Sequence, residues 1–180
     1  MVLMKNYAIA LGFKGKLYND INKALKIFKK DMNIKFMATN HASSHITILS
    51  GKTKNIDKIY EKIKKLKLKK FKLKSPGMGI FANQDPNLYL RWEQSLDLAK
   101  ISNIIRKQSS KLFHEVKQTP NNPMWVPKTT LAWKDLKYTD LNVIFKKTNF
   151  IFKKHEAVIS FIYFLAYNPD EIITHKIKLK

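Results

Sequence analysis

The sequence predicts an α/β protein built from two similar lobes. Stretches with the two-residue alternation typical of strands follow stretches in which apolar residues recur at helical spacing. Two parts of this pattern look like copies, because each has a short strand, a connection, a helix and a further strand. The copies begin at His45 and Lys128, 83 residues apart, which is nearly half of the 180-residue chain. This spacing predicts two lobes that face one another across a pseudo-twofold axis.

The first half of the chain is predicted to hold five strands and two helices. Apolar residues between 17 and 28 form the stripe of a first helix, for which Asn19 or Asp20 is the expected cap. A second stripe runs over residues 56–66. The strands are expected at residues 6–13, 45–49, 71–73, 78–82 and 87–92.

The second half continues the alternation. A third helix is expected over residues 98–112, followed by the most loop-like segment of the chain, residues 117–125. After that segment we expect a strand at 128–133, a short helix at 140–147, a long strand at 157–166 and a final strand at 174–180.

The charge of the chain favours phosphate-rich partners but has two explanations. The formal net charge is +22, and a field of that sign attracts polyanions and speeds their encounter. Only Arg91 and Arg106 are arginines among the 35 basic residues, although nucleic-acid readers usually favour arginine. Such lysine enrichment also fits an AT-rich genome, so selection for a polyanionic ligand and base composition both stay open.

The composition excludes several classes of protein. The chain has no cysteine, which rules out disulfides, thiol nucleophiles and thiolate–zinc sites. No apolar run approaches the roughly 18 residues of a membrane span, and the N-terminal stretch lacks the marks of a signal peptide. We therefore expect a single domain over residues 1–180: a cytoplasmic monomer with no membrane partner, no cofactor and no metal.

Two strands carry the residues most suited to chemistry. Side chains on a strand alternate between its two faces, so His45 and Thr47 project together, as do Lys128 and Thr130. If the lobes face one another, each supplies one nitrogen and one hydroxyl to a shared cleft. That set suits a phosphodiester, because hydroxyls bind non-bridging oxygens while one nitrogen activates a nucleophile and the other protonates the leaving oxygen. No metal is required.

These residues resemble the motifs of the two-histidine phosphoesterase superfamily, the LigT-like or 2′-5′ RNA ligase-like proteins. That family carries two His-x-Thr-hydrophobic motifs about 80 residues apart, and the resemblance covers nearly the whole chain. The sequence "HITI" at 45–48 matches the first motif fully. The sequence "WVPKTTLA" at 125–132 matches a common setting of the second, except that Lys128 stands where the family has histidine.

The resemblance implies a fold and an activity. The implied fold is bilobal and α/β, with two pseudo-symmetric lobes of antiparallel sheet and flanking helices around a central cleft lined by the motifs. Family members hydrolyse 2′,3′-cyclic phosphates or 2′-5′ linkages in RNA, oligoadenylates or cyclic dinucleotides. The expected protein is therefore a metal-independent phosphodiesterase acting on a nucleotide or RNA-derived ligand, with RNA as a further expected partner.

The lysine at position 128 leaves several hypotheses open. A lysine of ordinary pKa, near 10.4, is charged at pH 7 and is a poor base, but burial beside other cations lowers the pKa. In an enzyme, His45 would be the base, Lys128 the acid or electrostatic clamp, and Thr47 and Thr130 the phosphate donors. The alternatives are a catalytically impaired member of the fold that binds nucleotides or RNA, a basic RNA-binding module unrelated to the cleft, and an engineered or trapped variant.

Five further residues are candidates for substrate binding. They are His41, which precedes the first motif, Phe81 and Tyr163 on the strands that complete the copies, and Tyr89 and Arg91 on the strand at 87–92. An aromatic–basic strand of this kind stacks bases in some nucleic-acid-binding proteins. A loop position for His41, and core or surface packing for the others, are the competing interpretations.

Overall fold

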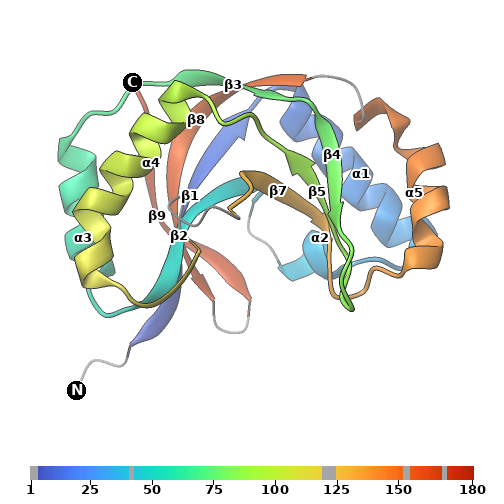
Figure 1. Ribbon diagram of the computed structural model, residues 1–180, viewed down its shortest axis with the longest axis horizontal. Helices are drawn as coiled ribbons and strands as arrows, with labels where there is room; N and C mark the ends of the chain where they lie inside the picture. The colour runs from blue at the N-terminus through green and yellow to red at the C-terminus, as the bar shows by residue number, and fades with distance from the viewer. Residues whose placement is uncertain (1–3, 41–42, 119–124, 152–154, 168–169) are drawn as a thin grey trace.

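The computed structural model describes residues 4–40, 43–118, 125–151, 155–167 and 170–180. These residues form two antiparallel sheets with helices on their outer sides (Figure 1). The predicted α/β class with antiparallel sheets and flanking helices is therefore confirmed. Within the part of the chain that the structure describes, no helix is both long enough and apolar enough to cross a membrane.

The two sheets differ in size. The larger has the order β3-β8-β1-β2-β6, and β9 pairs with the far half of β8; the smaller has the order β4-β5-β7. The strands of the larger sheet are β1 (Lys5–Lys14), β2 (His45–Thr53), β3 (Phe71–Ser75), β6 (His114–Gln118), β8 (His155–Tyr167) and β9 (Glu171–Lys178). Those of the smaller sheet are β4 (Gly77–Phe81), β5 (Asn87–Arg91) and β7 (Lys128–Ala132).

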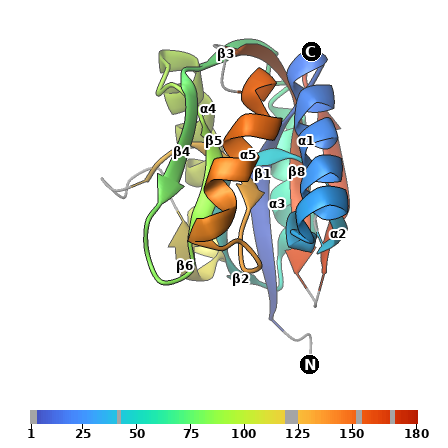
Figure 2. The same cartoon turned by 90° about the vertical axis from the view of Figure 1, so that its right-hand side faces the viewer.

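The helices gather on two sides of the sheets. Helices α3 and α4 lie on one side, and α1 and α5 lie together on the other (Figures 1 and 2). The helices are α1 (Lys16–Met32), α2 (Phe36–Asn40), α3 (Ile56–Lys65), α4 (Leu96–Ser109) and α5 (Leu141–Lys147). Single 3-10 turns occupy Ser110–Leu112, Tyr138–Asp140 and Asn149–Ile151.

Helix α1 begins earlier than the predicted cap. Its apolar stripe is buried as expected, but the helix starts at Lys16 and its N-cap residue is Gly15, with no side-chain cap. Gly15 has φ 100°, a conformation that glycine adopts without steric cost. This residue turns the chain directly from β1 into the helix, so the prediction of a cap at Asn19 or Asp20 was wrong.

Two elements have no clear signal in the sequence. Helix α2 is only five residues long, and its first backbone N–H groups are bound by a residue far along the chain. The Asp135 carboxylate accepts hydrogen bonds from the N–H groups of Lys35 and Phe36, both at 2.7 Å. Strand β6 is an edge strand that pairs with β2 at Ser50 and Lys52. Both elements depend on tertiary partners, which sequence periodicity does not record.

The two copies exchange their closing strands. The strand that completes the first copy, β4, lies in the smaller sheet beside β5, whereas the first copy begins with β2 in the larger sheet. The strand that completes the second copy, β8, lies in the larger sheet between β1 and β3, whereas that copy begins with β7 in the smaller sheet. Each lobe is thus built from both halves of the chain.

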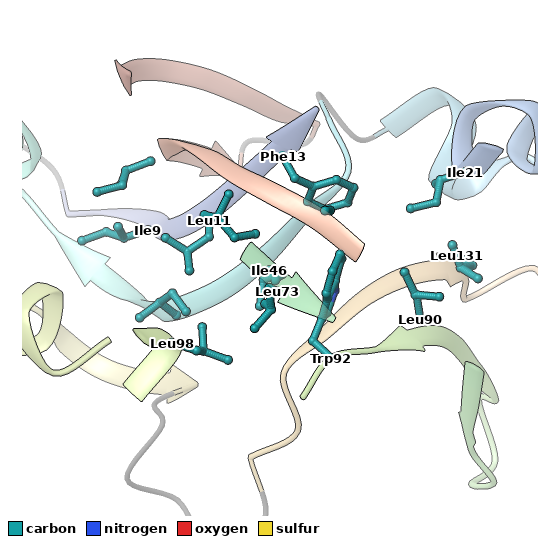
Figure 3. Packing of buried hydrophobic residues seen from close by; sticks show 14 of the residues in the cluster. Ile9, Leu11, Phe13, Ile21, Ile46, Leu73, Leu90, Trp92, Leu98 and Leu131 are labelled. Atoms are coloured by element: carbon teal, nitrogen blue, oxygen red, sulfur yellow. The ribbon is translucent and has the colours of Figure 1, made fainter. Parts of the chain in front are cut away.

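One hydrophobic cluster joins the two sheets. It includes residues of both sheets and of the helices on either side. At its centre the rings of Phe13 and Trp92 meet edge to face, with centroids 5.1 Å apart (Figure 3). Trp92 is fully buried, so this tryptophan, which follows β5, packs the smaller sheet against the larger.

Candidate active site

A pocket of about 470 Å³ lies where β2 and β7 meet α1 and α2. Four predicted site residues line it: His45 and Thr47 from β2, and Lys128 and Thr130 from β7. The alternation of the strands turns the intervening residues the other way, since Ile46 and Thr129 are almost fully buried. The structure thus brings the two predicted nitrogen–hydroxyl pairs to one pocket.

Thr129 holds the two motif strands together. Its hydroxyl donates to the backbone carbonyl of His45 at 2.9 Å and accepts from the indole Nε1–H of Trp92 at 3.0 Å. Thr129 is 1% exposed, so each bond satisfies a group with little access to water. The residue next to Lys128 is therefore bonded directly to the backbone of His45.

The imidazole of His45 is oriented by two oxygens. Its Nδ1 lies 2.8 Å from the carbonyl oxygen of Ser43 and 3.6 Å from Oε1 of Glu171. Both oxygens favour a proton on Nδ1, and in the neutral ring this leaves the lone pair on Nε2. The side chain of Glu171 is 1% exposed, which makes it a buried carboxylate beside a histidine.

Glu171 is itself held by a tyrosine. Tyr167, its register partner across the β8–β9 pair, forms a side-chain hydrogen bond with the carboxylate. Burial, together with the neighbouring carboxylate, raises the pKa of the Tyr167 phenol well above its ordinary value. Tyr167 therefore stays protonated and can donate to Glu171.

Lys128 has a different environment. Its Nζ donates to Oγ1 of Thr130 at 3.3 Å and lies 5.7 Å from the centre of the Phe81 ring. Burial lowers the pKa of the Lys128 ammonium below its ordinary value. No carboxylate among the described residues forms an ion pair with this ammonium.

Each sheet places a tyrosine over a glycine beside its motif strand. In the smaller sheet Tyr89 is the register partner of both Gly79 and Thr130, and its ring stacks on Phe81 at 4.6 Å. A Cβ on Gly79 would lie 2.7 Å from the Tyr89 ring, so this position requires glycine. In the larger sheet the ring of Tyr163 on β8 covers Gly12 on β1, so the glycine is next to the motif strand there, whereas the tyrosine is next to it in the smaller sheet. Both sides of the pocket thus have a tyrosine–glycine contact, with the two residues in reversed strand order.

Comparison with solved structures identifies the fold. No family model matches the sequence, and no curated protein matches it. Crystal structures do match over nearly their whole length. Apo LigT from E. coli has a TM-score of 0.61 at 12% identity, with 98% of each chain covered. LigT from E. coli in complex with 3′-AMP matches with a TM-score of 0.58 at 11% sequence identity, and 98% of each chain is covered. A protein described as a phosphoesterase matches with a TM-score of 0.59 at 11% identity, and 99% of each chain is covered. The chain has the LigT fold.

Within this LigT fold, four of the five remaining candidates lie around the pocket and do not line it. Phe81 contacts Lys128, and the hydroxyl of Tyr163 bonds to Ser43, a pocket residue. Tyr89 is buried. Arg91, which is the register partner of Lys128, is exposed. These four residues support or flank the site. His41 lies outside the described residues.

Sequence reasoning missed much of the wall that α1 contributes to this pocket. The side chains concerned are Tyr18, Asn22, Lys26 and Lys29. The first three recur every four residues, the spacing at which side chains share one helix face, so a polar stripe opposite the buried one was the available signal. Glu171 had no such signal, because it lies 126 residues from His45.

Proposed function

We propose that this protein is a metal-independent phosphodiesterase that acts on a nucleotide or RNA-derived ligand. The proposed substrates are a 2′,3′-cyclic phosphate, a 2′-5′-linked oligonucleotide or a cyclic dinucleotide. The observation that carries the proposal is the convergence of His45 with Thr47 and of Lys128 with Thr130 on one pocket. The nucleotides in the matching structures support it, since E. coli LigT was crystallised with 3′-AMP, NADP+ and ATP.

His45 is the proposed base. Its Nε2 takes a proton from water while the water oxygen bonds to phosphorus, and the resulting imidazolium is stabilised by the carboxylate of Glu171, 3.6 Å from Nδ1. Glu171 acts through the imidazole and does not reach the substrate, so it is a positioning residue. A fixed tautomer and ring orientation are what a general base requires.

Lys128 is the proposed acid. As the bond from phosphorus to the departing ribose oxygen breaks, the ammonium gives that oxygen a proton. Burial lowers the pKa of the ammonium, which makes it a better proton donor than an exposed lysine. The Thr130 hydroxyl accepts a hydrogen bond from Lys128, which leaves its own proton free to be donated. We propose that the hydroxyls of Thr130 and Thr47 donate hydrogen bonds to the non-bridging phosphate oxygens.

A second candidate function rests on the same lysine. We infer as the alternative a catalytically impaired protein that binds nucleotides or RNA in this pocket without cleaving them. The absence of an ion-pair partner for Lys128 among the described residues favours it, because a phosphate would supply the missing charge. In both cases we infer that residues 1–180 act as one two-lobed unit, since a single cluster spans both sheets.

A paired hydrolysis assay in EDTA separates the two functions. Wild type and Lys128→His are tested against 2′,3′-cyclic nucleotides, 2′-5′ oligoadenylates and cyclic dinucleotides. Turnover by wild type supports the phosphodiesterase, and turnover by Lys128→His alone supports the binder. If both folded proteins are inactive and 3′-AMP does not bind to either, both proposals fail.

A further inference from the structure

Lysines make up most of the lining of a second concave site. We call it the basic groove; its volume is about 200 Å³, and it lies between the end of α3 and the edge strand β9. Its lining residues are Tyr60, Lys64, Lys67, Leu68, Lys176, Ile177, Lys178 and Lys180. Five of these eight residues are lysine and none is acidic, so the groove presents a dense positive charge.

The backbone fixes the lysines of the groove in place. On β9 the two-residue period sends the exposed Lys176 and Lys178 to the face opposite His175, which packs on Tyr60 of α3, so the groove lies around the edge of the sheet and Lys64 of α3 is on its other side. The N–H of Lys70 donates to the carbonyl of Lys180 at 2.9 Å, and the N–H of Lys180 donates to that of Leu68 at 3.0 Å. Figure 1 shows the C-terminus beside the chain that leaves α3, as these bonds require.

Little negative charge is available to neutralise the groove. Residues 54–74 contain ten lysines and two acidic residues, Asp57 and Glu61. Asp57 already pairs with His175 at 3.1 Å, and Glu61 lies 3.7 Å from Lys64. Repulsion among the remaining ammonium groups is relieved when several phosphates bind together, which is the way that polyanions bind basic surfaces.

The groove lies at the edge of the larger sheet, and strand β2 of that sheet lines the pocket. Lys178, Phe161, Gly12 and His45 are successive register partners across β9, β8, β1 and β2, so about three strand spacings, or about 14 Å, separate Lys178 from His45. Lys176 lies 4.0 Å from the Phe161 ring on that path. With a rise of about 3.4 Å per nucleotide in a stacked strand, the gap corresponds to about four nucleotides.

We propose that the basic groove binds the backbone of a single-stranded polynucleotide whose end lies in the pocket. The pocket end of this proposal rests on the proposed function. The binding at the groove does not, because lysine contacts to phosphate depend on charge and position and carry no sequence information. A mononucleotide in the pocket does not reach the groove, so the groove would select longer strands.

The test compares two variants with the same loss of charge. The groove variant carries Lys64→Gln, Lys67→Gln and Lys178→Gln, and the control carries Lys107→Gln, Lys111→Gln and Lys146→Gln on α4, the turn after it and α5. Binding of a fluorescent 12-nucleotide RNA, and of DNA of the same sequence, is measured across salt concentrations. We expect the groove variant to bind at least tenfold more weakly, with a log–log salt slope reduced by about 2 for three lost phosphate contacts.

The controls separate this proposal from the function of the pocket. Binding of 3′-AMP should be unchanged in the groove variant and lost in Lys128→Ala. Equal weakening in the two triple variants would overturn the groove, because net charge alone would then explain the affinity. Retention of the wild-type salt slope, or groove-dependent binding of anionic vesicles without RNA binding, would also overturn it. Groove-dependent RNA binding without any turnover would contradict the proposed phosphodiesterase activity but would still support the proposed binding at the groove.

Discussion

The two sides of the pocket have similar backbones and different chemistry. On each side a strand presents a nitrogen and, two residues later, a threonine hydroxyl, near a tyrosine–glycine contact. His45 has a buried carboxylate 3.6 Å from its ring, whereas Lys128 has a neutral hydroxyl and an aromatic ring. The residue beside the histidine is therefore an acid, whereas the residues beside the lysine are uncharged.

This difference shows how a pseudo-symmetric scaffold specialises. The backbone pattern fixes where the two groups point, and the residues behind them decide what each can do. In the proposed mechanism, Glu171 stabilises the positive charge that His45 acquires when it acts as a base. Lys128 carries its charge before the reaction and is destabilised by burial, so it gains most from an anion or from loss of its proton.

Removal of the base should have the largest effect on turnover. We expect His45→Ala to lower kcat by about 1,000-fold, since general bases contribute about 10²–10⁴. Affinity for 3′-AMP should stay within about tenfold of wild type, because a base acts mainly in the transition state. Steady-state kinetics and calorimetry measure the two quantities. His114→Ala, at the exposed start of β6, is the matched control, and equal losses in both variants would contradict the assignment.

Removal of the Lys128 ammonium should lower turnover less than removal of His45 does, and it should raise the stability of the folded protein. We expect Lys128→Met to lower kcat by about 100-fold, the lower end of the effect of losing one electrostatic contact to the transition state.

The same variant should raise Tm at pH 7 by about 2–4 °C, equivalent to about 1 kcal/mol in a domain of this size. Burial lowers the pKa of Lys128, so the charged form destabilises the folded state below that lowered pKa. The destabilisation caused by charged Lys128 decreases as the pH rises toward 10.5, the ordinary pKa of lysine. The increase in Tm that Lys128→Met produces should decrease over the same pH range. Thermal unfolding at pH 7 and pH 10 measures this change, and an equal gain at both values would contradict it.

Loss of the bridge between the two sides should destabilise the protein moderately. Thr129→Val keeps the side-chain shape but leaves the Trp92 indole N–H and the His45 carbonyl without their partner. We expect a cost of about 2 kcal/mol and a Tm lower by about 4–8 °C. Thr129→Ser retains the hydroxyl and serves as the control. If valine and serine gave the same Tm in thermal unfolding, the bridge would have no role in stability.

The smallest effect should come from neutralising the acid behind His45. Glu171→Gln keeps a polar group beside the ring but removes the charge 3.6 Å from Nδ1, so the imidazolium loses stabilisation. We expect the acidic limb of the pH–turnover profile to move to lower pH, with maximal kcat within about tenfold of wild type. Glu156→Gln, at an exposed residue paired with Lys72, should leave the profile in place. A profile that does not move in Glu171→Gln would assign the carboxylate to structure alone.

The core of the site was within reach of sequence reasoning because it depends on local geometry. The two-residue period of a strand is enough to predict that His45 and Thr47 share a face, and that Lys128 and Thr130 do. The 83-residue offset predicted that the two strands belong to separate lobes, and the structure places them in two different sheets; the pseudo-twofold relation stays a prediction. The structure places all four side chains on one pocket, although their roles stay proposals.

The rest depends on contacts that no local pattern records. Glu171 approaches His45 only because the β8–β9 pair brings it there, and Asp135 binds the start of α2 from 100 residues away. Thr129 was passed over because it faces away from the pocket, yet it forms the bond that joins the two strands. The exchange of β4 and β8 between the lobes likewise has no counterpart in periodicity.

The position of β8 has a consequence for synthesis on the ribosome. This strand lies in the interior of the larger sheet, between β1 and β3, yet it begins 141 residues after β1 ends. At about 5–20 residues per second, β1 waits roughly 7–30 s for the partner that covers its second edge. During that interval the growing chain exposes a hydrophobic strand edge, which is a substrate for chaperones and a hazard for aggregation. A chain truncated before His155 would never complete the sheet, so premature termination should yield a product for degradation and not a smaller working protein.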